Sequence, residues 1–185
     1  MIDDVLSELK REIEETASKL KKEFAKVRTG RASTALLDGI LVEYYGSRTP
    51  LNQLATVNAP EPRLLVLTPF DRSVIGEIER AIKASDLGLN PINDGKLIRI
   101  PIPELTEERR RDLVKHVKKI AEDYRVSMRN HRRDANEMLK ELLKEKQISE
   151  DDHRHAHDKV QALTNEGIER IDRTLKAKEE EIMVV

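Results

Sequence analysis

Four arginines stand close together in the stretch RVSMRNHRRDANEMLKE, which spans residues 125–141. They are Arg125, Arg129, Arg132 and Arg133. In the sequence, only Asp134, directly after them, is expected to neutralise part of this charge. The planar fork of an arginine guanidinium grips two phosphate oxygens at once. The cluster therefore predicts contact with a polyanion, even though the formal net charge of the chain is only −1.

A helical wheel extends the cluster into a basic stripe beside an apolar seam. Five cations fall within an arc of about 60°. They are Arg111, Lys118, Arg125, Arg129 and Arg132, and Arg133 lies off the centre of the stripe. A stripe on a rigid helix suits a nucleic-acid backbone, because each neutralised phosphate also releases counterions. The last part of the chain is acidic, so pairing of some arginines with it stays open. No base-reading motif is present, which favours backbone and shape recognition of RNA.

A second group of residues suggests metal chemistry. The segment DDHRHAHD, residues 151–158, places His153 and His157 four residues apart, with Asp152 or Asp158 as a further oxygen ligand. The alternative is a polar helix start with no fixed ligand geometry, and we favour it. His131 is expected to pack on a helix seam with a hydrogen bond. Nothing resembles a nucleophile elbow or a phosphate-binding glycine loop, so we expect no enzyme, no cofactor and no metal.

Long helices must carry these groups. Apolar residues recur at helical spacing over residues 2–28, from about 106 to 147, and from about 150 to 182. Ser149 and Asp152 are spaced as a capping box for the last of these helices. Their narrow apolar stripes predict a three-helix bundle.

The region between the first two helices has a different character, since it holds all seven prolines. Strands are predicted at 40–46, 63–69 and 96–102, and a short helix capped by Asp71 at 71–85. The continuous apolar run in 63–69 indicates burial on both faces. The fold class is therefore α+β, a long three-helix bundle with a small inserted β/α/β domain.

We assign residues 1–29 and 106–185 to the bundle and 31–104 to the inserted domain. Two short connections join them and are predicted to act as a hinge. The hinge residues are Thr29, Gly30, Arg31, Pro103, Glu104 and Leu105. There is no cysteine, no run of about 18 apolar residues and no secretory or transit pattern at the start, so we expect a cytoplasmic protein without membrane contact.

Several long blocks, in order along the whole chain, resemble the bacterial ribosome recycling factor family. They are KVRTGRAS, LLDGILVEYYGSRTPLNQLA, FDRS, AIKASDLGLNP, LTEERRRDL, RNHRRDANEMLKELLKEKQISEDD and AKEEEIM. The resemblance implies an L-shaped, tRNA-like arrangement of two domains. It also implies a monomer that binds the ribosome after termination, along large-subunit ribosomal RNA at the transfer-RNA sites. With elongation factor G and GTP, such a protein splits the ribosome and releases mRNA and deacylated tRNA.

The resemblance also assigns residues. The RNA-facing arginines of the family match Arg28, Arg31, Arg110, Arg129, Arg132 and Arg133. Whether Asn130 and Asn136 touch RNA or only hydrogen-bond at the core edge stays open. The sequence departs from the family pattern at His131, where a branched apolar residue is usual, and at His155 and His157, in a region usually charged or amide-bearing. Two other classes remain as alternatives, a coiled-coil scaffold for a protein partner and a metal-dependent enzyme.

Overall fold

The computed structural model describes residues 1–184. Their contacts divide the chain into two compact units, each with its own core. The first combines Met1–Val27 with the chain from Glu108 onward, and the second is Arg28–Glu107. None of the helices within residues 1–184 combines the length and apolar character that crossing a bilayer requires.

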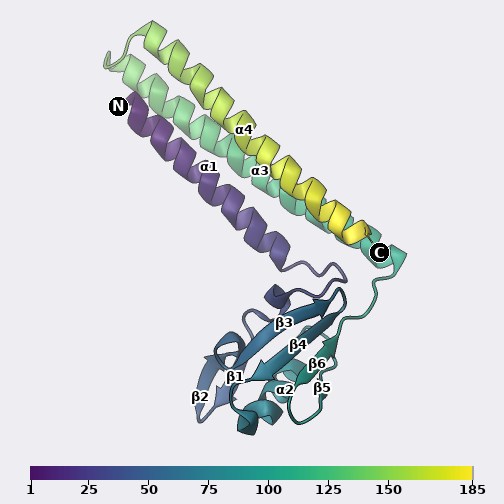
Figure 1. Ribbon diagram of the computed structural model, residues 1–185. Helices are drawn as coiled ribbons and strands as arrows, with labels where there is room; N and C mark the ends of the chain where they lie inside the picture. Colours follow the sequence, from purple (N-terminus) through teal and green to yellow (C-terminus); the bar gives the residue numbers. More distant parts are fainter. Residues whose placement is uncertain (185) are drawn as a thin grey trace. The chain divides into compact units, whose positions relative to one another are not determined.

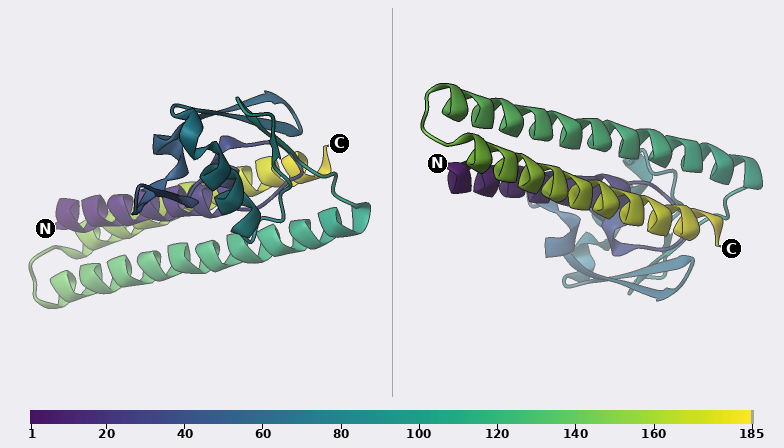
Figure 2. Two further views of the ribbon diagram at one scale, coloured as in Figure 1. Left: turned by 90° about the horizontal axis from the view of Figure 1, so that it is seen from below. Right: turned by 90° about the horizontal axis from the view of Figure 1, so that it is seen from above.

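The first unit is the predicted three-helix bundle. Its helices are α1 (Ile2–Ala25), α3 (Glu107–Lys144) and α4 (Glu150–Met183). They lie side by side, with α3 and α4 joined by a short turn at one end (Figures 1 and 2). The predicted capping box at the start of α4 is confirmed, because the Ser149 hydroxyl accepts from the Asp152 amide at 3.1 Å and the Asp152 carboxylate accepts from Ser149. The first helix ends at Ala25, three residues earlier than the pattern indicated.

Aliphatic residues at spacings of three and four form the core of the bundle. Those almost fully removed from solvent are Leu9 and Leu20 of α1, Val117, Met128 and Leu139 of α3, and Val160, Ile171 and Ile182 of α4. Side chains of the other two helices lie close to Gly167 of α4. A Cβ added there would lie 3.0 Å from Ile13 of α1 and 3.1 Å from Met128 of α3. This seam fixes which side of α3 faces α4, and so where its arginines lie.

The second unit contains two antiparallel sheets and one α-helix. Its elements are the 3₁₀ turns Thr34–Leu37, Leu51–Gln53 and Arg72–Val74, the strands β1 (Leu41–Tyr44), β2 (Ser47–Pro50), β3 (Ala55–Glu61), β4 (Leu64–Pro69), β5 (Ile92–Asn93) and β6 (Ile98–Pro101), and helix α2 (Ile75–Ala84). Strands β1 and β2 form a hairpin, and the larger sheet has the order β3-β4-β6-β5. One apolar cluster joins both sheets to α2 through Val42, Leu67, Ile78, Ile82 and Ile100. The α+β fold class is confirmed.

Two details of this unit differ from the sequence prediction. Strand β4 is not buried on both faces, because Leu65 and Leu67 are fully buried while Leu64 and Val66 are only half-buried. Such alternation is typical of an antiparallel strand with one face on the core. Asp71 caps the 3₁₀ turn Arg72–Val74 rather than α2 itself, by accepting a hydrogen bond from the Ser73 amide at 2.9 Å.

The two predicted hinge connections meet within the second unit. Gly30 has a φ of +76°, in the left-handed region that favours glycine. A Cβ at this position would lie 3.2 Å from the Leu105 side chain. The two chain segments therefore pass each other closely, and a side chain at Gly30 would require Leu105 to shift. Whether they act as a hinge remains a prediction.

Candidate nucleic-acid interface

Part of the basic stripe of α3 lies beside α4. Two of its cations reach across to acidic residues of α4. The Lys118 ammonium lies 3.7 Å from the Glu179 carboxylate, and the Arg125 guanidinium lies 2.6 Å from that of Asp172. The possibility that the acidic last helix pairs with part of the stripe is therefore realised. The stripe divides into a structural part and a part left facing solvent.

Arg125 belongs to the structural part. Its Nε and Nη2 both donate to Asp172 Oδ1, at 2.9 and 2.6 Å, and its Nη1 donates to Glu122 Oε2 at 3.1 Å. The side chain is only 23% exposed. Arg125 thus links α3 to α4 with three of its five N–H donors in use, one on each nitrogen, and its partial burial leaves it less accessible to a phosphate.

Arg129 is held in a different way. Its Nη2 donates to Glu122 Oε1 at 2.6 Å, two helical turns earlier on the same helix, and its side chain is 44% exposed. The Glu122 carboxylate therefore accepts hydrogen bonds from two arginines, Arg125 and Arg129. Their hydrogen bonds, first that of Arg129 and then that of Arg125, lower the pKa of the Glu122 carboxyl below its usual value. The expectation that only Asp134 neutralises the cluster is wrong, because Glu122 and Asp172 do so as well.

At the C-terminal end of the cluster, the positive charges of Arg132 and Arg133 are not balanced by a close ion pair among residues 1–184. The Arg132 side chain is half-buried. Among residues 1–184, no residue forms a hydrogen bond or ion pair with it. Arg133 is exposed, and its Nε lies 3.9 Å from Asp134, at the limit of an ion pair. Nearby, the Asn136 Oδ1 atom is buried and has no hydrogen-bond partner among the described residues. Arg132 and Arg133 are therefore the guanidinium groups of this cluster best placed to take a phosphate.

The other predicted arginines are not part of this cluster. Arg110 is about 28 Å before Arg129 along α3, at 1.5 Å per residue, and its Nη1 donates to the Met183 carbonyl at 3.2 Å. Arg111 is exposed at the same end of the helix. Arg28 and Arg31 belong to the second unit, where Arg28 Nη2 donates to the Asp86 carbonyl at 3.2 Å and Arg31 is exposed.

Sequence reasoning missed the acidic partners of the stripe, Glu122, Asp172 and Glu179. One of them was readable, because Glu122 and Arg125 are three residues apart and i, i+3 pairs of opposite charge meet on a helix. The contact of Glu122 with Arg129 spans seven residues, and the others cross between helices. These contacts follow from the bundle packing and leave no local signal.

The histidines show no metal site. The rings of His153 and His157 are 6.4 Å apart, and no group of three or more potential ligands occurs in the described part of the chain. His131 packs at the α1–α3 seam, as predicted. Its Nε2 lies 3.1 Å from the Thr16 hydroxyl and its Nδ1 3.2 Å from the Glu12 carboxylate.

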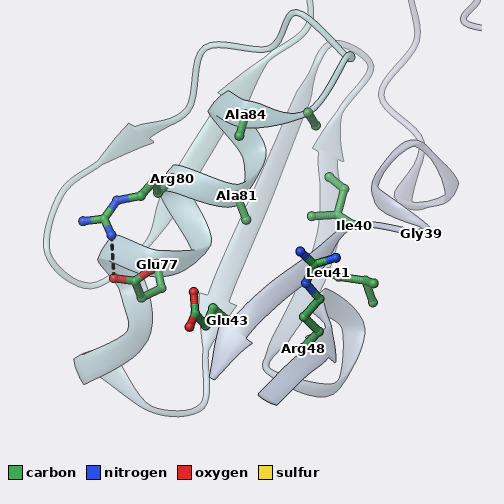
Figure 3. Close-up of a pocket in the computed structure, with 10 residues that line it drawn as sticks. Gly39, Ile40, Leu41, Glu43, Arg48, Glu77, Arg80, Ala81 and Ala84 are labelled. Atoms are coloured by element: carbon green, nitrogen blue, oxygen red, sulfur yellow. Dashed lines mark hydrogen bonds and ion pairs between the residues drawn. The ribbon is translucent and has the colours of Figure 1, made fainter. Parts of the chain in front are cut away.

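A separate groove lies on the second unit, between α2 and the β1–β2 hairpin (Figure 3). Its floor is aliphatic, and its rim carries two acids and two arginines. These are Glu43 and Arg48 of the hairpin and Glu77 and Arg80 of α2, with Arg80 Nη1 donating to Glu77 at 2.9 Å. The charges of opposite sign balance, and the lining includes Ser85 but no histidine that would activate it. The groove therefore offers neither a basic phosphate site nor a nucleophile with its base.

Comparisons with known proteins agree with the sequence resemblance. The family model described as ribosome recycling factor matches residues 20–183. Ribosome-recycling factors of Carboxydothermus hydrogenoformans, Halalkalibacterium halodurans and Bacillus subtilis are 53%, 56% and 52% identical, each over 100% of both chains. A solution structure of a ribosome recycling factor superposes with a TM-score of 0.80 at 43% identity, covering 100% of this chain and 98% of that one.

A second solved structure contains models of the T. thermophilus ribosome recycling factor and E. coli elongation factor G bound to the E. coli post-termination complex. Its recycling factor matches with a TM-score of 0.69 at 45% identity, and each chain is covered completely. The similarity extends over the full length of the chain in sequence and in fold. The chain belongs to the ribosome recycling factor family.

Proposed function

We propose that this protein binds the post-termination ribosome through large-subunit ribosomal RNA at the transfer-RNA sites. With elongation factor G and GTP, it splits the ribosome into subunits, and mRNA and deacylated tRNA are released. The proposal rests on full-length membership of the family and on the solved complex of a relative with elongation factor G on a post-termination complex. The observation that carries the RNA contact is the open positive charge at Arg132 and Arg133.

The proposed contact is to the RNA backbone. Arginine forks bind phosphate oxygens in pairs, and the helix offers them along one side without a base-reading motif. The proposed RNA-binding residues are Arg28, Arg31, Arg110, Arg129, Arg132 and Arg133, with Arg111, Lys118 and Arg125 as a secondary stripe. Arg125 and Lys118 support RNA binding indirectly, by stabilising the bundle, since they form ion pairs with Asp172 and Glu179 of α4.

The mechanism we propose is mechanical. The bundle is anchored on RNA by charge, and the connections at 29–31 and 103–105 let the second unit rotate while the bundle stays bound. Elongation factor G then moves the bound protein against a contact between the subunits. The protein itself catalyses no reaction, because GTP hydrolysis belongs to elongation factor G. In this proposal the protein works as a monomer in the cytoplasm.

Ribosome splitting tests the proposal directly. Purified post-termination complexes are mixed with elongation factor G, GTP and the protein, and light scattering follows the loss of intact ribosomes. Arg132→Ala is compared with Arg154→Ala, which removes the same charge from an exposed position of α4. We expect the native protein and Arg154→Ala to split ribosomes and Arg132→Ala to bind weakly and fail. If all three split equally well, recycling stands and the RNA contact at Arg132 does not.

Salt dependence tests the nature of the contact. Binding to a nucleic-acid backbone weakens linearly on a log–log plot as salt rises, with a slope set by the number of neutralised phosphates. We expect a steep slope for binding to purified large subunits. A flat response, or no binding, would favour a protein scaffold over an RNA-binding factor.

The hinge proposal has its own test in Gly30→Ala. This change places a Cβ 3.2 Å from Leu105 and strains a left-handed backbone. Gly39→Ala is the matched control, because Gly39 has a φ of +85° but nothing within 4 Å of an added Cβ. We expect Gly30→Ala to bind ribosomes normally and split them slowly, and Gly39→Ala to do both normally. Normal splitting by Gly30→Ala would contradict a role for motion at this connection.

A further inference from the structure

Glu122 and Asp172 form a four-charge cluster with Arg125 and Arg129 on the basic side of α3. Two carboxylates face two guanidinium groups, so the cluster has no net charge. Half of the arginines in the opening motif are therefore neutralised within the molecule. This is unexpected for a surface that binds a polyanion, and it raises the question of what the acidic groups do there.

The two carboxylates play different parts. Asp172 accepts two hydrogen bonds from the largely buried Arg125 and so connects α4 to α3. Glu122 is 51% exposed and holds the 44% exposed Arg129 through a single terminal nitrogen. A guanidinium has five N–H donors, so most of those on Arg129 remain available to another acceptor. The Glu122–Arg129 pair is thus the exchangeable part of the cluster.

Glu122 lies beside Arg129, where an RNA phosphate bound to that arginine would lie. On a helical wheel it lies about 20° from Arg129, and it precedes Arg129 by about 10.5 Å along the helix axis. A phosphate bound to Arg129 would therefore take the place of the Glu122 carboxylate or lie beside it. Either arrangement costs free energy, because an ion pair is broken or two negative charges come close.

We propose that Glu122 is a built-in competitor for RNA phosphate, which weakens the hold of Arg129 on the ribosome and speeds release of the protein. This inference rests on the proposed function, since it concerns the same RNA contact. A factor that acts once per termination event must leave the subunit afterwards, and an internal carboxylate gives Arg129 a second partner when the RNA departs. Arg132 has no such partner within residues 1–184, so it supplies affinity without this competition.

A role of Glu122 in pre-orienting Arg129 fits the geometry less well. A bidentate contact adds geometric specificity, whereas Glu122 offers Arg129 a single hydrogen bond at an exposed position. Exposed ion pairs of this kind are weak, so removal of the competition is expected to tighten binding by roughly 1.4- to fivefold.

The experiment compares Glu122→Gln with Asp123→Asn on purified large ribosomal subunits, with binding and dissociation followed by fluorescence. Asp123→Asn removes the same charge one residue away, and no ion pair involves that carboxylate within residues 1–184. We expect Glu122→Gln to bind about 1.4- to fivefold more tightly than Asp123→Asn, mainly through slower dissociation. We also expect a salt slope steeper by up to about 0.7–0.9, because Arg129 then neutralises a phosphate without losing a carboxylate.

The same two changes are made in an Arg129→Ala background. There we expect Glu122→Gln to give no gain, because the competing pair is already absent. Weaker or unchanged binding by Glu122→Gln, or a gain that persists without Arg129, overturns the inference while the RNA contact stands. If the native protein does not bind large subunits at all, the proposed function and this inference fall together.

Discussion

Gly167 of α4 faces Ile13 of α1 so closely that a Cβ added to the glycine would lie 3.0 Å from the Ile13 Cγ2 methyl. The Met128 sulfur of α3 lies 3.1 Å from the same point. Met128 has a flexible side chain, but the Ile13 methyl is attached to a branched carbon and moves only with its helix. A side chain added at Gly167 would therefore crowd both α1 and α3.

We predict that Gly167→Ala destabilises the bundle. Overpacking costs about 1–3 kcal/mol and alanine returns about 1 kcal/mol of helix propensity, so the free energy of unfolding should fall by up to about 2 kcal/mol. Urea denaturation followed by circular dichroism measures this change in the free energy of unfolding. Gly76→Ala in α2 is the control, because nothing lies within 4 Å of its added Cβ, and it should be neutral or stabilising. Equal effects of the two changes would mean that the bundle adjusts without cost.

The contact of His131 with Thr16 gives a second prediction. The Thr16 side chain is 7% exposed, and its hydroxyl lies 3.1 Å from His131 Nε2. His131→Leu makes this position apolar and leaves the Thr16 hydroxyl without its partner. Since an unsatisfied buried group costs about 1–3 kcal/mol, we expect a loss of that size.

Changing both partners should recover most of this loss. The double variant His131→Leu with Thr16→Val replaces the polar pair by two apolar groups, which is often nearly neutral. A double-mutant cycle in urea denaturation gives the coupling energy between the two positions. Strictly additive effects would show that the hydrogen bond does not stabilise the seam.

The helices were predictable because their apolar periodicity continues over many turns. The segments 2–28 and 150–182 each repeat one seam, and a repeated signal outweighs local exceptions. Even the start of α4 was readable, since Ser149 and Asp152 satisfy each other's backbone through local contacts alone.

Strands β2 and β3 could not be read from sequence for a physical reason. The first, Ser47–Pro50, is short and polar, and most of the second, Ala55–Glu61, is exposed. Strand β3 is an edge strand, where Pro60 is tolerated because one side needs no hydrogen-bond partner. Such strands are formed by pairing with β1 and β4, and they carry no alternating apolar pattern of their own.

The residue types of the candidate site could be predicted from the sequence. Which arginines stabilise the bundle and which remain available for a ligand could not. Arg125 and Arg132 look equivalent on a helical wheel, yet Arg125 has two acidic partners and no partner is seen for Arg132 among residues 1–184. The difference depends on Asp172, 47 residues away in sequence. Only the packing of α4 against α3 brings that carboxylate to Arg125.

The different partners of Arg125 and Arg132 predict different effects of their alanine variants on stability. Arg125→Ala should lower the free energy of unfolding by about 1–3 kcal/mol, because hydrogen bonds to charged partners are lost at a largely buried site. Arg132→Ala should change it by no more than about 0.5 kcal/mol. Thermal unfolding separates the two cases.

Ribosome binding should show the reverse order. Arg132→Ala is expected to weaken binding strongly, whereas Arg125→Ala, assayed where it is fully folded, should weaken it less. If Arg125→Ala proves as stable as the native protein, the link between α3 and α4 through Asp172 contributes little.

The capping box of α4 predicts a dependence of stability on pH. Hydrogen bonds from the Ser149 side chain and then its backbone lower the pKa of Asp152 below its ordinary value of 3.8. A group whose pKa is lower in the folded state stabilises that state above the unfolded pKa. The contribution is lost as the pH falls from about 4 through the lower, folded value. Asp152→Ala should therefore lower the Tm at pH 7.

The difference in Tm between the native protein and Asp152→Ala should then shrink as the pH falls below 4, because the native carboxyl becomes protonated. Asp151→Ala is the matched control. It removes a carboxylate from the same helical turn, where the favourable interaction with the helix dipole is similar, but takes no part in the capping box. Equal losses for the two variants at pH 7 would mean that helix-dipole charge, and not the cap, stabilises the start of α4. A difference that stays constant from pH 7 to pH 3 would show that the ionised carboxylate of Asp152 is not what the cap requires.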